Sequence, residues 1–458
     1  MFQMNVDEIL KATEGIPAGG NGSGLVTGIS TDSRKIRPGD LFIPLTGEKF
    51  DGHDYIRGAF EQGAAAALTQ REIPGLNGKP LILVKDTLIA LQALAASYRS
   101  RFSIPFVGIT GSVGKTSTKE MVACALGVKY NVLKNEGNLN NEIGVPLTIF
   151  NLNEGHEAAV VEMGMSGFGE ISALTAIVRP KVGIITNIGI SHIEKLGSRQ
   201  NILKAKLELL EGLQPDGLLI LNGDDVLLSG VKGLLPQRSV SYGLEEGVDY
   251  LAFNVKSYGE SGVEFDITVE GRDYTVKVPA PGMHNIYNAL AAVAAGCELG
   301  VPMEDLLQGI SRFVPGKMRM NIIKANGLTV INDAYNSSPQ SVKAALDVLE
   351  ELEAGRRVVV LGDMLELGEW SAQAHLETGR QAAGMKLDYI VTSGTCASDI
   401  VKGAAEAGFP AERLAAFPDN ASTLEYLTKI VQKGDAILVK GSRGMKMEEI
   451  VHSLTAEG

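Results

Sequence analysis

The residues from 104 to 118 constrain this chain more than any other segment. They read Ile-Pro-Phe-Val-Gly-Ile-Thr-Gly-Ser-Val-Gly-Lys-Thr-Ser-Thr, an apolar strand pattern that passes through a glycine-rich turn into a helix pattern. The backbone N–H groups of such a turn, together with the helix N-terminus, form a binding site for phosphate. The glycines allow close approach, the lysine can reach the outer phosphates, and the threonine hydroxyl can hold Mg²⁺. We therefore predict an ATP site formed by Thr110, Gly111, Ser112, Val113, Gly114, Lys115, Thr116 and Ser117.

The spacing of this loop is irregular, because Gly108 lies one residue too far upstream for the usual G-x-x-x-x-G-K-[ST] pattern. The alternative is an ordinary strand-to-helix turn that contains Gly-Lys-Thr. The strand, glycines, lysine and hydroxyls nevertheless occur in the order that phosphate binding requires, and this order favours the nucleotide site.

Composition limits the class of protein and its partners. A chain of 458 residues exceeds the usual size of a single core, so we expect two or three domains. The net charge of −12 argues against nucleic acid as a partner and leaves small-molecule substrates. We find no signal-peptide pattern and no apolar run of the ~20 residues that a membrane span requires. We therefore expect a soluble cytoplasmic protein without membrane insertion. A monomer is also expected, although none of these observations gives the oligomeric state.

The order of apolar segments predicts an α/β fold with three domains. Residues 1–103 read as a small α/β N-terminal domain, with a strand at 40–45 and a helix at 88–98. Residues 104–314 alternate strands and helices, which favours a central, mostly parallel, P-loop ATPase-like domain. Within them, residues 248–278 alternate polar and apolar side chains, as an antiparallel patch at a sheet edge would. Residues 315–458 contain strand patterns at 357–361, 389–392 and 436–439, which predict a Rossmann-like C-terminal domain.

Two further strands of the central domain end at residues that can handle phosphate or metal. The run 158–161 ends at Glu162, and the run 182–186 ends at Asn187 and leads to His192. Ligands of doubly wound sheets bind at the carboxyl ends of the strands, so Glu162 and His192 are predicted to face the nucleotide. Glu162 is a suitable Mg²⁺ ligand together with the Thr116 hydroxyl. The alternatives are a solvated glutamate and a loop histidine bonded to backbone.

Lys206 is a less obvious candidate. Helical spacing over residues 201–210 places it among leucines and isoleucine, while Lys204 lies on the opposite polar face. Partial desolvation favours its neutral amine, which can take up CO2 and become a carbamate that binds Mg²⁺. From the residues alone, a lysine that extends its ammonium to solvent is the better interpretation.

Taken together, these motifs resemble the Mur ligase family, the ATP-dependent amide-bond-forming enzymes of peptidoglycan synthesis. The resemblance covers essentially the whole chain. Its motifs are the loop at 110–116, Glu162, the segments at 187–192 and 205–208, Gly-Met-His-Asn-Ile-Tyr-Asn-Ala at 282–289, and third-domain segments. The family has a shorter phosphate loop than the common type, and it carries a carbamylated lysine at the position of Lys206. The resemblance therefore reverses the interpretation of Lys206.

Several segments are similar to the members of the family that add D-Ala-D-Ala. They include residues 30–34, 50–53, 137–146, 332–339, 360–369 and 440–445. The resemblance implies that ATP activates the C-terminal carboxylate of UDP-N-acetylmuramoyl-tripeptide as an acyl phosphate, which the amine of D-Ala-D-Ala then attacks. It also implies two Mg²⁺ ions, held by Thr116, Glu162, His192 and carbamylated Lys206, with Lys115 neutralising phosphate. One departure is the extra residue in Pro-Gly-Lys-Met-Arg-Met at 315–320.

The resemblance also assigns binding residues, and each has a structural alternative. Asn285 and Asn288 are similar to adenine-side contacts, with a helix cap at Asn285 and a buried amide at Asn288 as alternatives. Arg319 and Asp333 are similar to residues that reach phosphate and ribose, while Asp333 could be a turn residue. The implied substrate contacts are Ser30, Ser33, Arg34, Asn138, Asn140, Asn141, Tyr335 and Asn336. An Asx-type turn with a surface arginine is the alternative at 30–34, and a plain loop at 138–141.

Two other functions remain open from the sequence. A folylpolyglutamate synthase shares the chemistry but would lack the Ser-Thr-Asp-Ser-Arg segment at 30–34. A non-catalytic nucleotide-binding regulator would have no need of the second metal ion that Lys206 implies.

Overall fold

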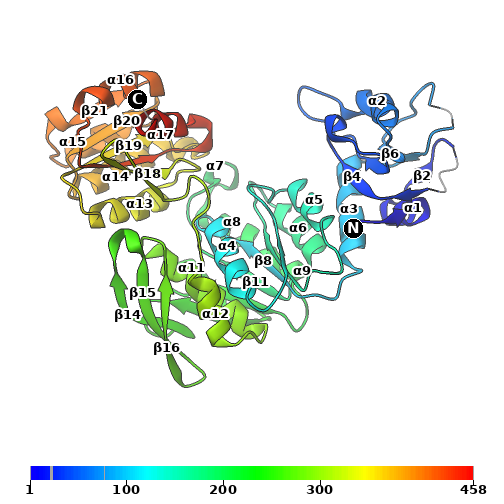
Figure 1. Cartoon of the computed structure of the whole chain (residues 1–458), viewed down its shortest axis with the longest axis horizontal. Helices are drawn as coiled ribbons and strands as arrows, with labels where there is room; N and C mark the ends of the chain where they lie inside the picture. The colour runs from blue at the N-terminus through cyan, green and yellow to red at the C-terminus, as the bar shows by residue number, and fades with distance from the viewer. Residues whose placement is uncertain (1, 21–23, 77, 457–458) are drawn as a thin grey trace. The chain divides into compact units, whose positions relative to one another are not determined.

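The computed structural model describes residues 2–20, 24–76 and 78–456. Within them the chain divides into two compact units (Figure 1). The first contains residues up to 109 together with 130–183 and 208–217, and the second contains 110–129, 184–207 and the residues from 218 on.

The N-terminal part of the first unit is a small α/β sheet. Its strand order is β2-β7-β6-β5-β4, in which β2 is antiparallel to β7 and the other neighbours are parallel. A separate antiparallel pair joins β1 to β3. Asp86 begins α3, the longest helix of this N-terminal part, by accepting hydrogen bonds from the N–H groups of Leu88 and Ile89. The bounds are β1 Met4–Asn5, α1 Val6–Thr13, β2 Ile16–Pro17, β3 Leu25–Val26, β4 Gly28–Ser30, β5 Asp40–Phe42, α2 Ile56–Glu61, β6 Ala66–Thr69, β7 Leu81–Leu83 and α3 Thr87–Arg99.

The rest of the first unit holds buried parallel strands. β10 (Ala158–Glu162) pairs in parallel with β8 (Phe106–Thr110) and with β9 (Val132–Lys134). All residues of β8 and β10 are buried, as expected for strands covered on both faces. The helices of this part are α5 Gly144–Ile149, α6 Glu170–Val178 and α9 Leu209–Gly212, and β11 (Val182–Ile185) begins in this unit.

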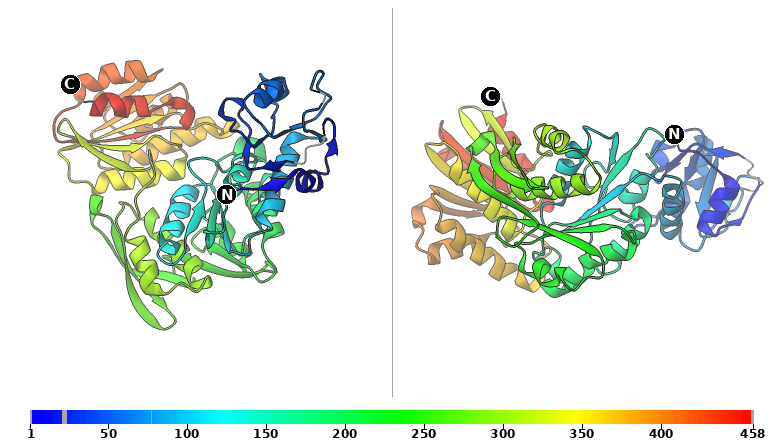
Figure 2. Two further views of the ribbon diagram at one scale, coloured as in Figure 1. Left: turned by 45° about the vertical axis from the view of Figure 1, so that its right-hand side comes forward. Right: turned by 90° about the horizontal axis from the view of Figure 1, so that it is seen from below.

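The second unit begins with the helix that follows the glycine-rich turn. This helix, α4 (Lys115–Leu126), packs on α11 (His284–Glu298) and α12 (Met303–Ile310). β12, β13 and β14 are parallel neighbours, and β14, β15 and β16 form the antiparallel ribbon drawn in green in Figure 2. The remaining bounds are α7 Ile193–Leu196, α8 Arg199–Leu207, β12 Leu218–Asn222, α10 Val226–Lys232, β13 Arg238–Gly243, β14 Tyr250–Ser257, β15 Val263–Val269 and β16 Arg272–Val278.

The C-terminal part of the second unit is a six-stranded sheet in the order β17-β18-β22-β19-β20-β21. Only β17 is antiparallel to its neighbour. Figure 1 shows α13 and α14 on one side of this sheet and α16 and α17 on the other. The bounds are β17 Asn321–Ala325, β18 Leu328–Asp333, α13 Pro339–Glu351, β19 Arg356–Gly362, α14 Ser371–Ala383, β20 Tyr389–Ser393, α15 Ser398–Glu406, β21 Leu414–Phe417, α16 Asn420–Ile430, β22 Asp435–Lys440 and α17 Glu448–Thr455.

The predicted α/β class is confirmed, because the sheets are mostly parallel and alternate with helices. The antiparallel patch at 248–278 is confirmed as β14–β16. The helix predicted over 201–210 is wrong at its C-terminal end, since α8 stops at Leu207 and α9 starts at Leu209. β17 and β21 were not predicted. The domain limits 1–103, 104–314 and 315–458 stay predictions.

Candidate active site

The glycine-rich turn joins β8 to α4 in the way that the sequence predicts. Gly111 has a φ of 151°, and a Cβ built there would lie 1.9 Å from the Thr186 hydroxyl oxygen. Gly114 has a φ of 85° and is the residue before α4, which has no side-chain cap. The N-terminus of α4 therefore keeps the positive end of its dipole available to an anion. The buried Thr110 hydroxyl has no hydrogen-bond partner among the described residues.

Asn187 holds this loop, a role that was not predicted. Its Oδ1 accepts the N–H of Val113 at 2.9 Å, and its Nδ2 donates to the carbonyl of Val113 at 2.9 Å. Its own carbonyl accepts the N–H of Ser112 at 3.1 Å. The hydroxyls of Thr186 and Ser112 add bonds to Val113 and to the N–H of Gly189. The loop is therefore fixed by the strand end 186–189, and the amides of Ser112 and Val113 are used in fixing it.

Lys115 and Lys206 are close enough to affect each other. Nζ of Lys115 donates to the carbonyls of Gly111 at 2.7 Å and Ser112 at 3.3 Å, so the side chain folds over the loop. Lys206 is only 2% exposed in α8. Burial, with a smaller contribution from the charge of Lys115, lowers the pKa of Lys206 well below its usual value. The alternative of a Lys206 that extends its ammonium to solvent is therefore wrong, because α8 packs this face inward.

Asn285 and Asn288 form a buried chain of hydrogen bonds that begins on α4. Thr118 donates to Asn288 Oδ1 at 2.9 Å, Asn288 Nδ2 donates to Asn285 Oδ1 at 3.0 Å, and Asn285 Nδ2 donates to the carbonyl of Pro281 at 2.8 Å. The alternative of a helix cap at Asn285 is wrong, because α11 begins one residue earlier and Asn285 lies inside it. Asn288 is the predicted buried amide, and it lies beside the loop, since a Cβ on Gly114 would be 3.6 Å from its Oδ1.

In the first unit, Glu162 lies at the end of β10 and is 2% exposed. Its Oε1 accepts from Asn140 Nδ2 at 2.7 Å. The buried Asn135 bonds to the backbone of Glu162: its Oδ1 accepts the N–H at 2.9 Å, and its Nδ2 donates to the carbonyl at 3.0 Å. Asn140 therefore orients a carboxylate, and the alternative of a solvated Glu162 is wrong.

The neighbouring asparagines differ from Asn140. Asn141 Oδ1 accepts the N–H of Gly144 at 2.9 Å and so supports the start of α5. Asn138 is exposed on the loop before it. The structural alternative therefore describes Asn141 well.

His192 lies before α7 with a φ of 63°. Its Nδ1 is 2.5 Å from Oε2 of Glu366. This hydrogen bond lowers the pKa of Glu366. The alternative of a His192 side chain bonded to backbone is therefore wrong, because its Nδ1 pairs with a carboxylate. A carboxylate on one ring nitrogen is the arrangement that orients the other nitrogen of a metal-binding histidine.

The C-terminal candidates gather around one lysine. Lys440, at the end of β22, is 2% exposed and donates to Asp333 Oδ2 at 2.6 Å and to the carbonyl of Asn336 at 2.8 Å. Asp333 Oδ1 also accepts the N–H of Met320 at 3.1 Å. Asp333 is thus the last residue of β18 in a buried ion pair, and the turn alternative does not describe it.

Arg319 and Tyr335 stack in the same cluster. The Arg319 guanidinium lies 4.0 Å from the centre of the Tyr335 ring. The N–H of Tyr335 donates to the carbonyl of Met318 at 3.2 Å, which joins the 318–320 loop to the end of β18. Arg319, Asp333, Tyr335 and Asn336 therefore lie in one cluster, and their assignment to ligands stays a prediction.

The polar segment at 30–34 forms the Asx-type turn that was its alternative. Asp32 Oδ1 accepts the N–H of Arg34 at 3.1 Å, and its carboxylate pairs with the guanidinium at 2.8 Å. This hydrogen bond with Arg34 lowers the pKa of Asp32 to about 2. Ser30 is buried and bonds to the Asp32 backbone, while Ser33 begins a short 3-10 helix. The Arg34 side chain is exposed and available to an anion.

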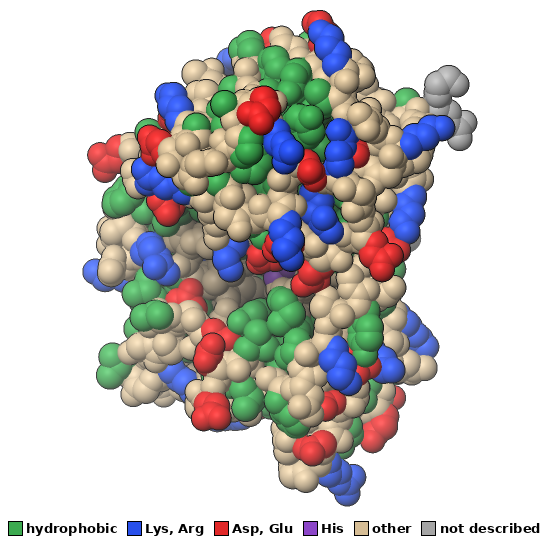
Figure 3. Space-filling view, turned by 90° about the vertical axis from the view of Figure 1, so that its left-hand side faces the viewer, with side chains coloured by type: hydrophobic (Ala, Val, Ile, Leu, Met, Phe, Trp, Pro, Cys, Tyr) green, Lys and Arg blue, Asp and Glu red, His purple; other side chains and the backbone are tan. Residues whose placement is uncertain are grey.

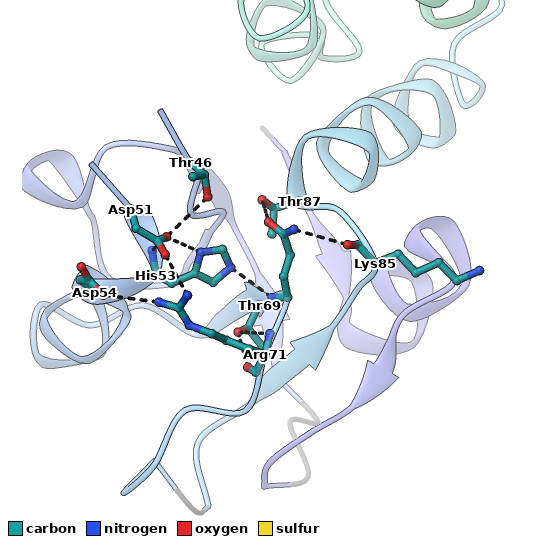
Figure 4. Close-up of polar contacts among 9 residues, drawn as sticks. Thr46, Asp51, His53, Asp54, Thr69, Arg71, Lys85 and Thr87 are labelled. Atoms are coloured by element: carbon teal, nitrogen blue, oxygen red, sulfur yellow. Dashed lines mark hydrogen bonds and ion pairs between the residues drawn. The ribbon is translucent and has the colours of Figure 1, made fainter. Parts of the chain in front are cut away.

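The nearby His53 is held on both ring nitrogens (Figure 4). Its Nδ1 is 2.6 Å from Asp51 Oδ1, and its Nε2 accepts the N–H of Gln70 at 3.1 Å. The carboxylate also pairs with Arg71 at 2.9 Å. Both ring nitrogens of His53 are therefore occupied, so we assign this residue a structural role.

Sequence reasoning missed three residues that organise these sites: Asn187, Lys440 and Glu366. Asn187 and Lys440 are strand-end polar residues in segments that the resemblance included, and this position was the available signal. Glu366 also lies in such a segment, at 360–369, but its pairing with His192 leaves no local signal because the two residues are far apart in the sequence.

The comparison with known proteins decides the family. Three family models match this chain: "Mur ligase family, catalytic domain" at residues 25–99, "Mur ligase middle domain" at 109–296 and "Mur ligase, glutamate ligase domain" at 318–443. A Bacillus subtilis protein named UDP-N-acetylmuramoyl-tripeptide--D-alanyl-D-alanine ligase is 43% identical, covering 98% of this chain and 97% of its own length. The chain belongs to the Mur ligase family.

Solved structures agree with this membership. MurF from Acinetobacter baumannii is 33% identical with a TM-score of 0.91, covering 99% of this chain and 98% of its own. MurF from Thermotoga maritima in complex with ADP is 28% identical with a TM-score of 0.82, covering 93% and 96%. These likenesses confirm the three-domain Mur ligase architecture.

Among the described residues, Lys and Arg side chains are mixed with Asp and Glu over the face shown in Figure 3, and no broad basic area lies there. None of the helices in the described part of the chain combines the length and apolar character needed to cross a bilayer.

Proposed function

We propose that this Mur ligase joins D-Ala-D-Ala to the C-terminal carboxylate of UDP-N-acetylmuramoyl-tripeptide and converts ATP to ADP and phosphate. The observation that carries the proposal is the likeness to the Bacillus subtilis ligase over nearly the full length of both chains. The glycine-rich loop fixed by Asn187 supplies the phosphate site that this chemistry needs.

For the nucleotide, we assign phosphate binding to residues 110–117. Lys115 already lies over the loop, so it can move from the loop carbonyls to phosphate oxygens without leaving the site. The Asn288–Asn285 pair lies on α11 beside Gly114, where it can position the base. Arg319 and Asp333 are proposed to reach phosphate and ribose from the C-terminal part.

For magnesium, the donor types fit. Thr116 and Glu162 offer the oxygen ligands that Mg²⁺ prefers. The Glu366 carboxylate on Nδ1 leaves His192 Nε2 as its ligand atom. The lowered pKa of Lys206 favours the neutral amine that carbamate formation requires. Bound Mg²⁺ would neutralise the charges of phosphate and carboxylate, and we propose two ions.

The proposed reaction has two chemical steps, phosphorylation of the tripeptide carboxylate and attack by the dipeptide amine. An oxygen of the tripeptide carboxylate attacks the γ-phosphorus, the bond to the ADP oxygen breaks, and a mixed anhydride forms. The amine lone pair of D-Ala-D-Ala attacks the acyl carbon, and the tetrahedral intermediate expels phosphate while the nitrogen loses a proton. Lys115 and the N-terminus of α4 stabilise the negative charge of the phosphoryl group. Arg34 and Ser30 with Ser33 are proposed for the uridine diphosphate, and Asn138, Asn140 and Asn141 for the muramoyl peptide.

Tyr335 and Asn336 are proposed to face the incoming dipeptide. We also propose that the protein acts in the cytoplasm, since the nucleotide and nucleotide-linked substrates are cytoplasmic small molecules. We further propose that it is a monomer.

The experiment is phosphate release from ATP with the UDP-linked tripeptide and D-Ala-D-Ala added singly and together. The proposal expects turnover only with both substrates, and a product heavier by the dipeptide in mass spectrometry. Turnover that ignores the dipeptide contradicts it. Release with a folate substrate would support the folylpolyglutamate alternative, and nucleotide binding without turnover would support a regulator.

A further inference from the structure

The turn after β12 contacts the strand end that fixes the phosphate loop. Asp225 Oδ2 accepts the N–H of Ile188 at 2.8 Å. Its Oδ1 accepts the N–H groups of Leu227 at 3.0 Å and Leu228 at 3.2 Å and so begins α10. One carboxylate therefore serves both a helix start and a buried backbone group, since Ile188 is 1% exposed.

The carbonyl of the same residue is also held by a charged group. Nε and Nη2 of Arg199 donate to the Ile188 carbonyl at 3.1 and 2.7 Å. On either side of Ile188, Asn187 bonds to Val113 and the N–H of Gly189 bonds to the Ser112 hydroxyl. Asp225 and Arg199 thus fix the segment 187–189 through the backbone of Ile188. The same segment in turn fixes the phosphate loop through Asn187 and Gly189.

The neighbouring carboxylate makes a second connection. Asp224 Oδ2 accepts from the Tyr287 hydroxyl at 2.8 Å and from the N–H of Leu244 at 2.8 Å. Tyr287 lies on α11 between Asn285 and Asn288. The turn at 222–225 therefore contacts both the helix with the proposed base contacts and the segment that holds the phosphate loop.

We propose that Asp225 and Arg199 are positioning residues for the nucleotide, acting through the 187–189 segment on the phosphate loop. This inference rests on the proposed function, because it takes the loop to be the nucleotide site. Losing the Asp225 bond frees the N–H of Ile188 and lets Asn187 move, so the loop loses its fixed geometry before nucleotide binds.

The test is ADP·Mg²⁺ binding to the full chain by calorimetry. Asp225→Ser keeps a short acceptor for the start of α10 but cannot also reach Ile188. The matched control is Asp86→Ser, because Asp86 begins α3 with the same pair of cap bonds and lies outside the proposed site. A lost bond to a charged acceptor predicts about tenfold weaker ADP binding for Asp225→Ser and unchanged binding for Asp86→Ser.

The KM values for the two substrates distinguish a specific effect on the nucleotide from a general loss of stability. We expect the KM for ATP to rise about tenfold in Asp225→Ser while the KM for the UDP-linked tripeptide stays the same. If Asp225→Ser does not fold, Arg199→Lys carries the test, with ADP binding weakened severalfold.

Unchanged ADP affinity in the folded variant overturns the inference, and so does an equal loss in both serine variants. Failure of the unaltered chain to bind ADP overturns the proposed function and this inference together. Binding by the unaltered chain with no turnover contradicts the proposed function alone.

Discussion

Replacing Lys440 by methionine should destabilise the C-terminal part strongly. The Lys440 side chain is 2% exposed and Asp333 is 13% exposed, with 2.6 Å between Nζ and Oδ2. Methionine fills a similar volume but leaves the Asp333 carboxylate buried without its counter-charge. Removing one partner of a buried pair costs about 3–5 kcal/mol. Because Asp333 keeps the N–H of Met320 and some exposure, we expect the lower end, about 3 kcal/mol.

Urea unfolding of the full chain measures this loss. Trp370 is the only tryptophan and lies before α14 in the C-terminal part, so its fluorescence reports on that part. With a slope of about 2–3 kcal/mol per molar urea, the midpoint should fall by about 1–1.5 M. The control is Lys429→Met, which breaks an exposed pair with Glu425 and should change stability by less than about 0.5 kcal/mol.

A second substitution separates charge burial from lost packing. Adding Asp333→Asn to Lys440→Met removes the unpaired carboxylate and should restore much of the stability. Equal midpoints for Lys440→Met and Lys429→Met, or no recovery in the double variant, would refute the reasoning.

Three other predictions concern different parts of the chain. Asn187→Asp keeps the acceptor for the Val113 N–H but loses the donor to its carbonyl, so ADP binding should weaken at least tenfold; calorimetry with equal affinity would contradict this. The N–H of His53, with smaller contributions from its ring and from arginine, lowers the pKa of Asp51 from 3.8 to about 2. The ionised Asp51 carboxylate therefore stabilises the fold above about pH 4, and this stabilisation is lost as the pH falls towards 2. Asp51→Asn should remove about 1–2 kcal/mol of this acid dependence. Denaturant titrations that give the same acid profile for the variant and the unaltered chain would contradict this prediction. Lys206→Ala should lose turnover that short carboxylates partly restore, whereas full activity, matching a Lys204→Ala control, would rule out the carbamate.

The sequence predicts the parts of the site that are local. The loop at 110–117 and the strand end at Glu162 were predicted because a strand, a turn and a helix leave patterns within a few residues. The start of α13 is equally local, since Ser338 caps the helix and Pro339 is its first residue.

The partners of these residues could not be predicted in the same way. Asn187 and Lys440 bond to residues 74 and 107 positions away, and no short-range pattern records such pairs. The cap alternative at Asn285 fails for a different reason, because α11 begins at His284 and Asn285 lies inside the helix. The burial of Lys206 also depends on which elements cover α8.

The third-domain cluster suggests why the C-terminal sheet tolerates a buried lysine. Lys440 donates to Asp333 and to the Asn336 carbonyl, so its buried ammonium group has two acceptors. A buried charge is tolerated when it is paired and hydrogen-bonded.

The formation of an acyl phosphate is the central claim, and an isotope measurement tests it most directly. The UDP-linked tripeptide is labelled with ¹⁸O in its C-terminal carboxylate and turned over with ATP and D-Ala-D-Ala. The account predicts that the released phosphate carries one ¹⁸O atom from the carboxylate, because the carbon–oxygen bond breaks when the amine displaces phosphate. Release of unlabelled phosphate during amide formation would contradict it.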